Sequence, residues 1–272
     1  MPTNDPAPDR AELLAILEWY RAAGATAALS ETSLDRLAAG PAARSARVAA
    51  PANLASANGA PEAGEARLQP DAGTIEAARA LAAAAPDLET LERLLDGFDG
   101  CPLKLRATRL VFADGNPQAK VMLIGEAPGR DEDLQGKPFV GRSGQLLDRI
   151  LKAIGLDRGS VYIANTVPWR PPGNRIPSPA ELAVCRPFLE RQVELVAPKI
   201  VVALGGASAK HLFGTDTGIL RLRGQWRELE IGAHRCMAMA TLHPAYLLRQ
   251  PAQKKLVWRD MLSLKARLEV DA

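Results

Sequence analysis

The sequence predicts an α/β protein: a three-layer α/β/α sandwich around a central, mostly parallel four-stranded sheet. From about residue 96 onward, short apolar runs rich in β-branched residues alternate with longer segments of helical periodicity. Strands are expected at 120–125, 160–164, 199–204 and 236–241. Helices are expected at 144–154, 178–197, 206–212 and 252–268. Because the runs are continuously apolar, the sheet should be parallel and covered on both faces.

The region before residue 96 differs in character. Residues 1–36 are expected to form an N-terminal helical segment, since apolar residues recur at helical spacing over 9–24. Residues 37–73 consist largely of Ala, Pro, Gly and Ser, which cannot bury a core and predict a flexible linker. Helical patterning resumes over 74–95. The predicted catalytic domain therefore comprises residues 74–272.

Two helix starts carry clear local signals. Ser178, Pro179 and Glu181 give the 178–197 helix a cap, a first-turn proline and the acid of a capping box. Gly141–Gly144 opens another helix, and the N-terminus of a helix favours phosphate.

Charge is unevenly distributed along the chain. Residues 1–95 carry 8 Lys/Arg and 13 Asp/Glu, whereas the remaining residues carry 26 and 18. The basic C-terminal part is compatible with a polyanionic partner such as nucleic acid. No apolar run is long enough for a membrane helix, and the polar start does not predict a signal peptide. Three cysteines without secretory features predict reduced thiols and a cytoplasmic location.

Polar residues follow three of the predicted strands. Glu126 follows the first strand, Asn165 the second and His243 the last. In parallel sheets ligands bind at the carboxyl ends of the strands, so these side chains are expected to converge. The surrounding motifs contain neither G-x-G-x-x-G nor a Walker A sequence. Taken singly, each residue also has a structural interpretation, and a leucine pair such as Leu247–Leu248 is ordinarily helix core.

Three motifs together resemble the uracil-DNA glycosylase superfamily, most closely its family 4. They are GEAPGRDEDLQGKPFVGRSG at 125–144, NTVPWRPPGNR at 165–175 and LHPAYLLR at 242–249. The resemblance extends over about residues 96–268, with the motifs in order. It implies a monofunctional enzyme that flips uracil out of single- or double-stranded DNA, hydrolyses its N-glycosidic bond and leaves an abasic site.

The resemblance assigns roles that suit the residue types. Glu126 would hold or deprotonate the attacking water, and His243 would donate to the uracil O2 as negative charge develops there. Phe139 would stack on the base, and Asn165 would pair with its N3–H and O4. Gly125, Ala127, Glu132 and Asp133 would complete the substrate pocket, and Glu132 or Asp133 would exclude a thymine methyl or assist the water.

DNA contacts are expected around this pocket. Leu247 and Leu248 would wedge into the base stack where the nucleotide leaves. The backbone would be held by the helix start and by basic side chains. These residues are Arg142, Ser143, Gly144, Arg170, Arg249 and Lys254. No membrane partner is expected, and one DNA site is compatible with a monomer.

The sequence departs from family 4 at the ligands of its 4Fe–4S cluster. Phe98 and Trp169 replace two of the four cysteines, whereas Cys101 and Cys185 remain. Neither replacement coordinates iron, so no cluster and no metal site is predicted. The third cysteine, Cys236, lies in the last strand pattern and reads as a core residue.

Two alternative functions remain open at this stage. One is a protein that binds uracil or abasic sites without fast turnover, and the other is a glycosylase for another deaminated base such as hypoxanthine. The segment after Phe139 lacks the inserted basic loop and histidine of the covalently trapping branch of the superfamily, so turnover is expected.

Overall fold

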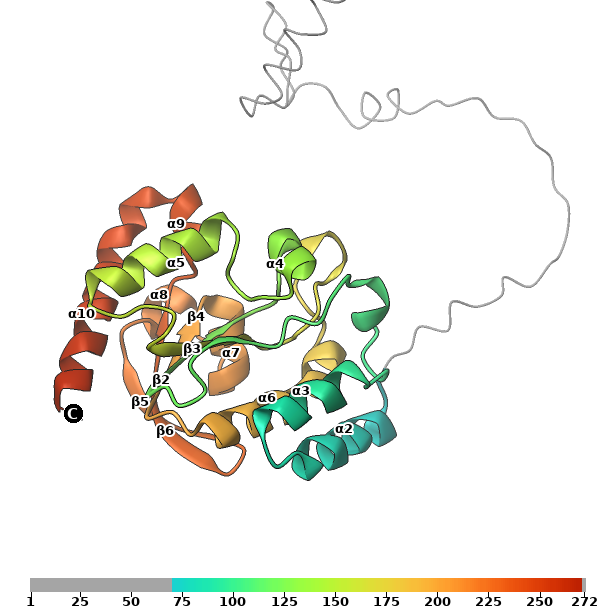
Figure 1. The fold of residues 1–272 in the computed structure, drawn as a ribbon. Helices are drawn as coiled ribbons and strands as arrows, with labels where there is room; N and C mark the ends of the chain where they lie inside the picture. Colours follow the sequence, from blue (N-terminus) through green and yellow to red (C-terminus); the bar gives the residue numbers. More distant parts are fainter. Residues whose placement is uncertain (1–69, 271–272) are drawn as a thin grey trace, which may run out of the picture. The chain divides into compact units, whose positions relative to one another are not determined.

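The computed structural model describes residues 70–270, and its centre is a six-stranded sheet of order β1-β3-β2-β4-β6-β5 (Figure 1). The four central strands are parallel, which confirms the predicted sheet. They are β2 (Val121–Gly125), β3 (Val161–Asn165), β4 (Ile200–Leu204) and β6 (His234–Thr241). The prediction missed the antiparallel edge strands β1 (Asp114–Gly115) and β5 (Trp226–Ile231). The predicted 9–24 helix and the linker up to residue 69 lie outside the described residues.

Side chains of the central strands alternate between two helical layers. Val121 and Leu123 pack with α5 (Arg142–Ala153), α9 (Pro244–Arg249) and α10 (Lys254–Val270). Met122 and Ile124 face the opposite layer, which is built on α6 (Pro179–Val196). The helices α2 (Ala72–Ala84) and α3 (Leu88–Asp96) pack on α6 (Figure 1). The three-layer α/β/α fold is thereby confirmed.

Several helices differ from the predicted ranges. The predicted 74–95 helix is two helices, because the chain is extended at Ala85 and Pro86 removes a backbone donor. The predicted 206–212 helix is α7 (Gly206–Phe213). Sequence patterning missed α4 (Arg130–Gln135), α8 (Ile219–Leu222) and α9, each six residues or fewer. Among residues 70–270, no helix has the length and apolar character of a membrane span.

Strand register brings the predicted site residues to one edge of the sheet. Gly125 at the end of β2 pairs with Asn165 at the end of β3. Beyond this pair, Thr166 Oγ1 donates to the Glu126 carbonyl at 2.6 Å, so Glu126 is tied to the neighbouring strand end. On the other side, Leu204 of β4 pairs with Thr241, two residues before His243.

A buried ion pair ties α10 to the end of β6. Asp260, 2% exposed, accepts from Arg223 Nε at 3.0 Å and from Thr241 Oγ1 at 2.6 Å. Burial raises the pKa of Asp260, while its hydrogen bonds to Thr241 and Arg223 oppose that shift. Removing one partner of such a pair leaves an uncompensated buried charge, which is the costly outcome.

Asp260→Ala is therefore expected to lower the free energy of unfolding by about 3 kcal/mol or more, because Arg223 loses its buried counter-charge. Arg235→Ala is the matched control, since its pair with Glu230 is solvent-exposed and is expected to contribute less than about 1 kcal/mol. Urea denaturation of both variants measures the difference. Equal losses would show that the buried network does not stabilise this end of the sheet.

Candidate active site

A cavity of about 440 Å³ opens at the carboxyl edge of the sheet. It brings together the four residues of the central prediction: Glu126, Phe139, Asn165 and His243. Of the other predicted residues, Ala127, Glu132, Ser143 and Arg249 also line it. The remaining lining residues are Pro128, Gly129, Pro171, Asn174, Arg175, Ile176, Ala245 and Tyr246.

Phe139 forms one wall of the cavity and is held in an unusual backbone conformation. Its φ is +55°, a left-handed value that costs a non-glycine residue about 1–3 kcal/mol. Its ring lies against Gly125, where a Cβ would come within 2.7 Å of the Phe139 Cζ. Its carbonyl lies against Gly144 in the first turn of α5, where a Cβ would overlap the oxygen. Both glycines are therefore required by close approach.

Asn165 offers an unused hydrogen-bonding atom to the cavity. Its side chain is buried, and its Oδ1 has no hydrogen-bond partner. A buried polar atom without a partner is costly, so an orphaned acceptor in a cavity wall marks a place where a ligand donor fits.

His243 caps the N-terminus of α9, and its Nδ1 accepts from the Ala245 N–H at 3.1 Å. Because Nδ1 is an acceptor, a neutral imidazole carries its proton on Nε2, where it can donate. Burial, assisted by the charge of Arg249, lowers the pKa of His243 to about 4. The ring is therefore a neutral donor at physiological pH, and it lies 5.4 Å from the Phe139 ring centroid.

Glu126 also lines the cavity, immediately after β2. Its carboxyl is partly buried, and burial raises its pKa above the ordinary value. A carboxylate with a raised pKa is a stronger base than a solvated one. The cavity thus combines an acid, an amide, an aromatic ring and a neutral imidazole.

The adjacent acids Glu132 and Asp133 have structural duties. Glu132 Oε1 accepts from the backbone N–H groups of Val140 and Gly141, both at 3.0 Å, so it holds the loop that carries Phe139. Asp133 does not line the cavity; its carboxylate accepts from Thr108 N at 2.7 Å and from Arg109 N at 3.3 Å. The structure therefore places the predicted substrate-binding residue Asp133 in contact with the 108–109 backbone and outside the cavity lining.

The two leucines of the predicted wedge differ in their exposure to solvent. Leu247 is 0% exposed and packs in the core under α9, so it is not available to DNA. Leu248 is 39% exposed and remains available. The difference arises because consecutive helix residues point about 100° apart, and only Leu248 faces outward.

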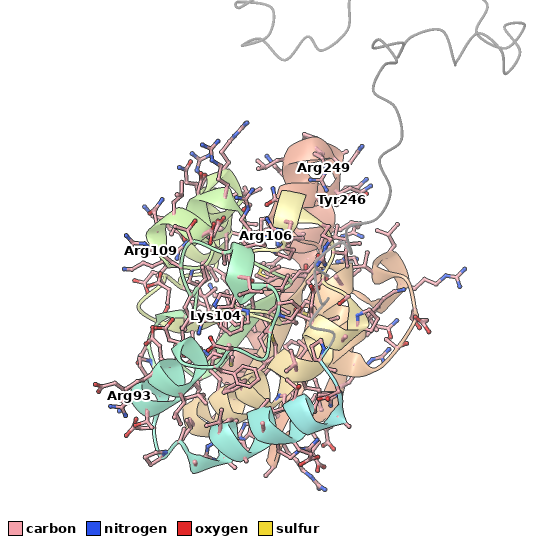
Figure 2. The ribbon with its side chains drawn as sticks, turned by 90° about the vertical axis from the view of Figure 1, so that its right-hand side faces the viewer. Arg93, Lys104, Arg106, Arg109, Tyr246 and Arg249 are labelled. Carbon is pink, nitrogen blue, oxygen red and sulfur yellow. The ribbon has the colours of Figure 1, made fainter. Side chains whose placement is uncertain are left out.

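Of the predicted DNA contacts, Ser143 and Arg249 line the cavity, and the others differ in exposure. Arg142, Arg249 and Lys254 are exposed, and Gly144 is buried in the α5 turn beside Ser143. Arg170 Nε donates a hydrogen bond to Asn174 Oδ1 at 2.7 Å within the same loop. Figure 2 shows Arg249 and Tyr246 together on α9, with Arg106 and Arg109 on the same face.

Sequence reasoning missed the contribution of Arg175 and Tyr246 to the cavity. Arg175 donates to Glu181 Oε2 at 2.8 Å, and this interaction raises its pKa. The R-P-P-G-N-R segment was the available signal for Arg175, and the position one turn before Arg249 was the signal for Tyr246.

Comparison with known proteins agrees with this geometry. The family model of the uracil DNA glycosylase superfamily matches residues 112–262. The chain belongs to the uracil-DNA glycosylase superfamily. A type-4 uracil-DNA glycosylase of Archaeoglobus fulgidus is 42% identical over 60% of this chain and 84% of the relative. The type-4 enzyme of Thermotoga maritima is 40% identical over 66% and 93%, respectively. A type-5 enzyme of Thermus thermophilus is 33% identical over 36% of this chain and 51% of the relative.

The region expected to hold an iron–sulfur cluster in family 4 has a different composition in this superfamily member. Cys101 and Cys185 are buried with their Sγ atoms 3.7 Å apart. Phe98 and Trp169 are buried in the same apolar cluster as the two thiols. Within residues 70–270, no group of three or more His, Cys, Asp and Glu side chains is arranged to hold a metal ion. The residues present therefore do not fit a four-thiolate cluster.

His243 is expected to make stability depend on pH. In the unfolded chain it binds a proton as the pH falls below about 6.5, whereas in the folded protein it stays neutral until about pH 4. The unfolded state therefore binds more protons in this window. The stability that neutral His243 contributes, roughly 3 kcal/mol, is lost as the pH falls from 6.5 to 4.

Urea denaturation at a series of pH values measures this loss, with His243→Gln as the comparison. The variant should lose less stability over the same pH range. Parallel curves for the two proteins would show that the folded and unfolded pKa values of His243 are equal.

Proposed function

We propose that the protein is a monofunctional uracil-DNA glycosylase that hydrolyses the N-glycosidic bond of a flipped uracil and leaves an abasic site. The observation that carries this proposal is the shared cavity of Glu126, Phe139, Asn165 and His243, with the orphaned Asn165 Oδ1 in its wall. Membership of the superfamily and the type-4 relatives support the same activity.

Base recognition follows from the amide and the ring. Asn165 Oδ1 accepts from uracil N3–H, and its amide N–H₂ donates to O4. Cytosine presents the reverse pattern at these positions and is disfavoured. The Phe139 ring supplies the stacking face that a base needs once it has left the helix.

The chemistry places opposite charges on the two fragments. As the C1′–N1 bond breaks, its electron pair passes to the base, and the Nε2–H of His243 stabilises the negative charge at O2. A water oxygen bonds to C1′ while Glu126 accepts the water proton, and the carboxylate also offsets positive charge on the sugar. Glu126 passes its proton to solvent and the uracil anion takes up one, so the products are free uracil and an abasic site.

DNA is held around the cavity mouth by the exposed groups. The α5 N-terminus with Arg142 and Ser143, and the side chains of Arg249 and Lys254, contact phosphates. Leu248 fills the space that the flipped nucleotide leaves. Single strands and U:G pairs are favoured substrates, since weakly held bases cost least to flip.

The main test uses labelled oligonucleotides that contain uracil, hypoxanthine or an abasic site, followed by alkaline cleavage. The wild type should cut at uracil. Glu126→Gln and His243→Ala should each lower the single-turnover rate about 100-fold or more. Asn165→Ala should weaken base selection. Glu228→Gln, an exposed acid on β5, is the matched control and should keep the wild-type rate.

The outcome of this assay distinguishes a uracil-DNA glycosylase from the two alternative functions. Binding of uracil DNA without cleavage would favour a lesion-binding protein, and cleavage at hypoxanthine alone would favour a different deaminated base. Full rates in both Glu126→Gln and His243→Ala would contradict the roles proposed for these side chains.

We further propose that catalysis needs no iron–sulfur cluster, because Phe98 and Trp169 stand where two ligands would be needed. Protein purified without oxygen should contain no stoichiometric iron and show no visible absorbance band of a cluster. It should still release uracil in the presence of a chelator. Stoichiometric iron bound through Cys101 and Cys185, lost in Cys101→Ser, would overturn the proposal.

A further inference from the structure

Arg158 contacts the backbone of the loop that carries Phe139 but does not line the cavity. It lies in the turn between α5 and β3, and its side chain reaches the loop that carries Phe139. Its Nη1 donates to the Pro138 carbonyl at 3.2 Å, and its Nη2 donates to the Phe139 carbonyl. It is not among the residues that line the cavity.

Two carboxylates fix the orientation of the Arg158 guanidinium. Asp114 Oδ2 accepts from Nη1 at 2.7 Å, and Asp148 Oδ1 accepts from Nε at 2.8 Å. Asp114 belongs to the short edge strand β1, and Asp148 belongs to α5. The Arg158 side chain is 26% exposed, so these pairs are partly shielded from solvent.

The same loop is held from the other direction by Glu132. Glu132 accepts the N–H groups of Val140 and Gly141, whereas Arg158 donates to the carbonyls of Pro138 and Phe139. The loop backbone is thus bound through the carbonyls of Pro138 and Phe139 and through the N–H groups of the two residues that follow. This arrangement surrounds a residue with φ of +55°.

We infer that Arg158 is a positioning residue that holds the Phe139 ring in place for stacking on the extruded base. This inference rests on the proposed glycosylase function and deepens it. A planar guanidinium with donors in a fixed fork reaches two successive carbonyls and two carboxylates together. A lysine ammonium is a point charge on a flexible stem and does not reproduce that geometry.

The test is a double-mutant cycle on single-turnover uracil release from a single-stranded oligonucleotide. Arg158→Gln should lower the maximal rate about tenfold, since a small misplacement of a positioned group is costly. In the Phe139→Leu background the same change should have little further effect, because Arg158 acts through the ring. Arg158→Lys should fail to restore the rate.

Arg186→Gln is the matched control, because it removes one positive charge from an exposed pair on α6. It should keep the wild-type rate and the wild-type dependence of DNA binding on salt. Thermal denaturation of each variant checks that it is folded at the assay temperature.

Three results would overturn the inference. Independent, multiplicative losses in the double variant would show that Arg158 does not act through Phe139. Full rescue by Arg158→Lys, or a change confined to the salt dependence of binding, would show that its charge alone matters.

Hydrogen exchange of the backbone amides of residues 139–144 gives a readout that does not need turnover. Exchange should rise about tenfold or more in Arg158→Gln and stay unchanged in Arg186→Gln, since the loop loses its acceptor-side anchor. Unchanged exchange in Arg158→Gln would contradict the inference. If the wild type releases no uracil, the proposed function fails, while this measurement still tests whether Arg158 holds the loop.

Discussion

The fixed position of the Phe139 ring is the constraint on which the rest of the site depends. The ring lines the cavity, packs against Gly125 and has its centroid 5.4 Å from that of the His243 ring. That position requires a left-handed backbone, which is unfavourable for phenylalanine and persists only where its surroundings determine it. Gly144, Glu132 and Arg158 supply those surroundings through close approach and hydrogen bonds.

The sequence was sufficient to predict that Glu126, Asn165 and His243 lie at the same edge of the sheet. Each follows a continuous apolar run, and parallel strands place their carboxyl ends at one edge. The edge strands escaped prediction because β1 has two residues and β5 alternates with charges in WRELEI. The sequence could not predict the different hydrogen bonds of Glu132 and Asp133, because their partners, Val140 and Thr108, come from separate loops. Arg158 gave no signal, since its contacts are to backbone carbonyls 19 and 20 residues away.

Close packing joins the segment around Phe98 and Cys101 to α6. Trp169 and Phe98 occupy a buried apolar cluster with Cys101 and Cys185, and Phe98 also packs on Phe188 at a ring distance of 5.3 Å. Aromatic side chains contribute large buried areas, so they join α6 to the preceding segment through apolar contacts. The Arg175–Glu181 pair then connects the start of α6 to the cavity wall.

The most direct measurement is a crystal structure of Glu126→Gln bound to a uracil-containing oligonucleotide. The account predicts the uracil ring stacked on Phe139, with N3–H within hydrogen-bond distance of Asn165 Oδ1 and O2 facing His243 Nε2. A uracil that remains in the DNA stack, or that binds elsewhere while Asn165 Oδ1 stays without a partner, would contradict the account.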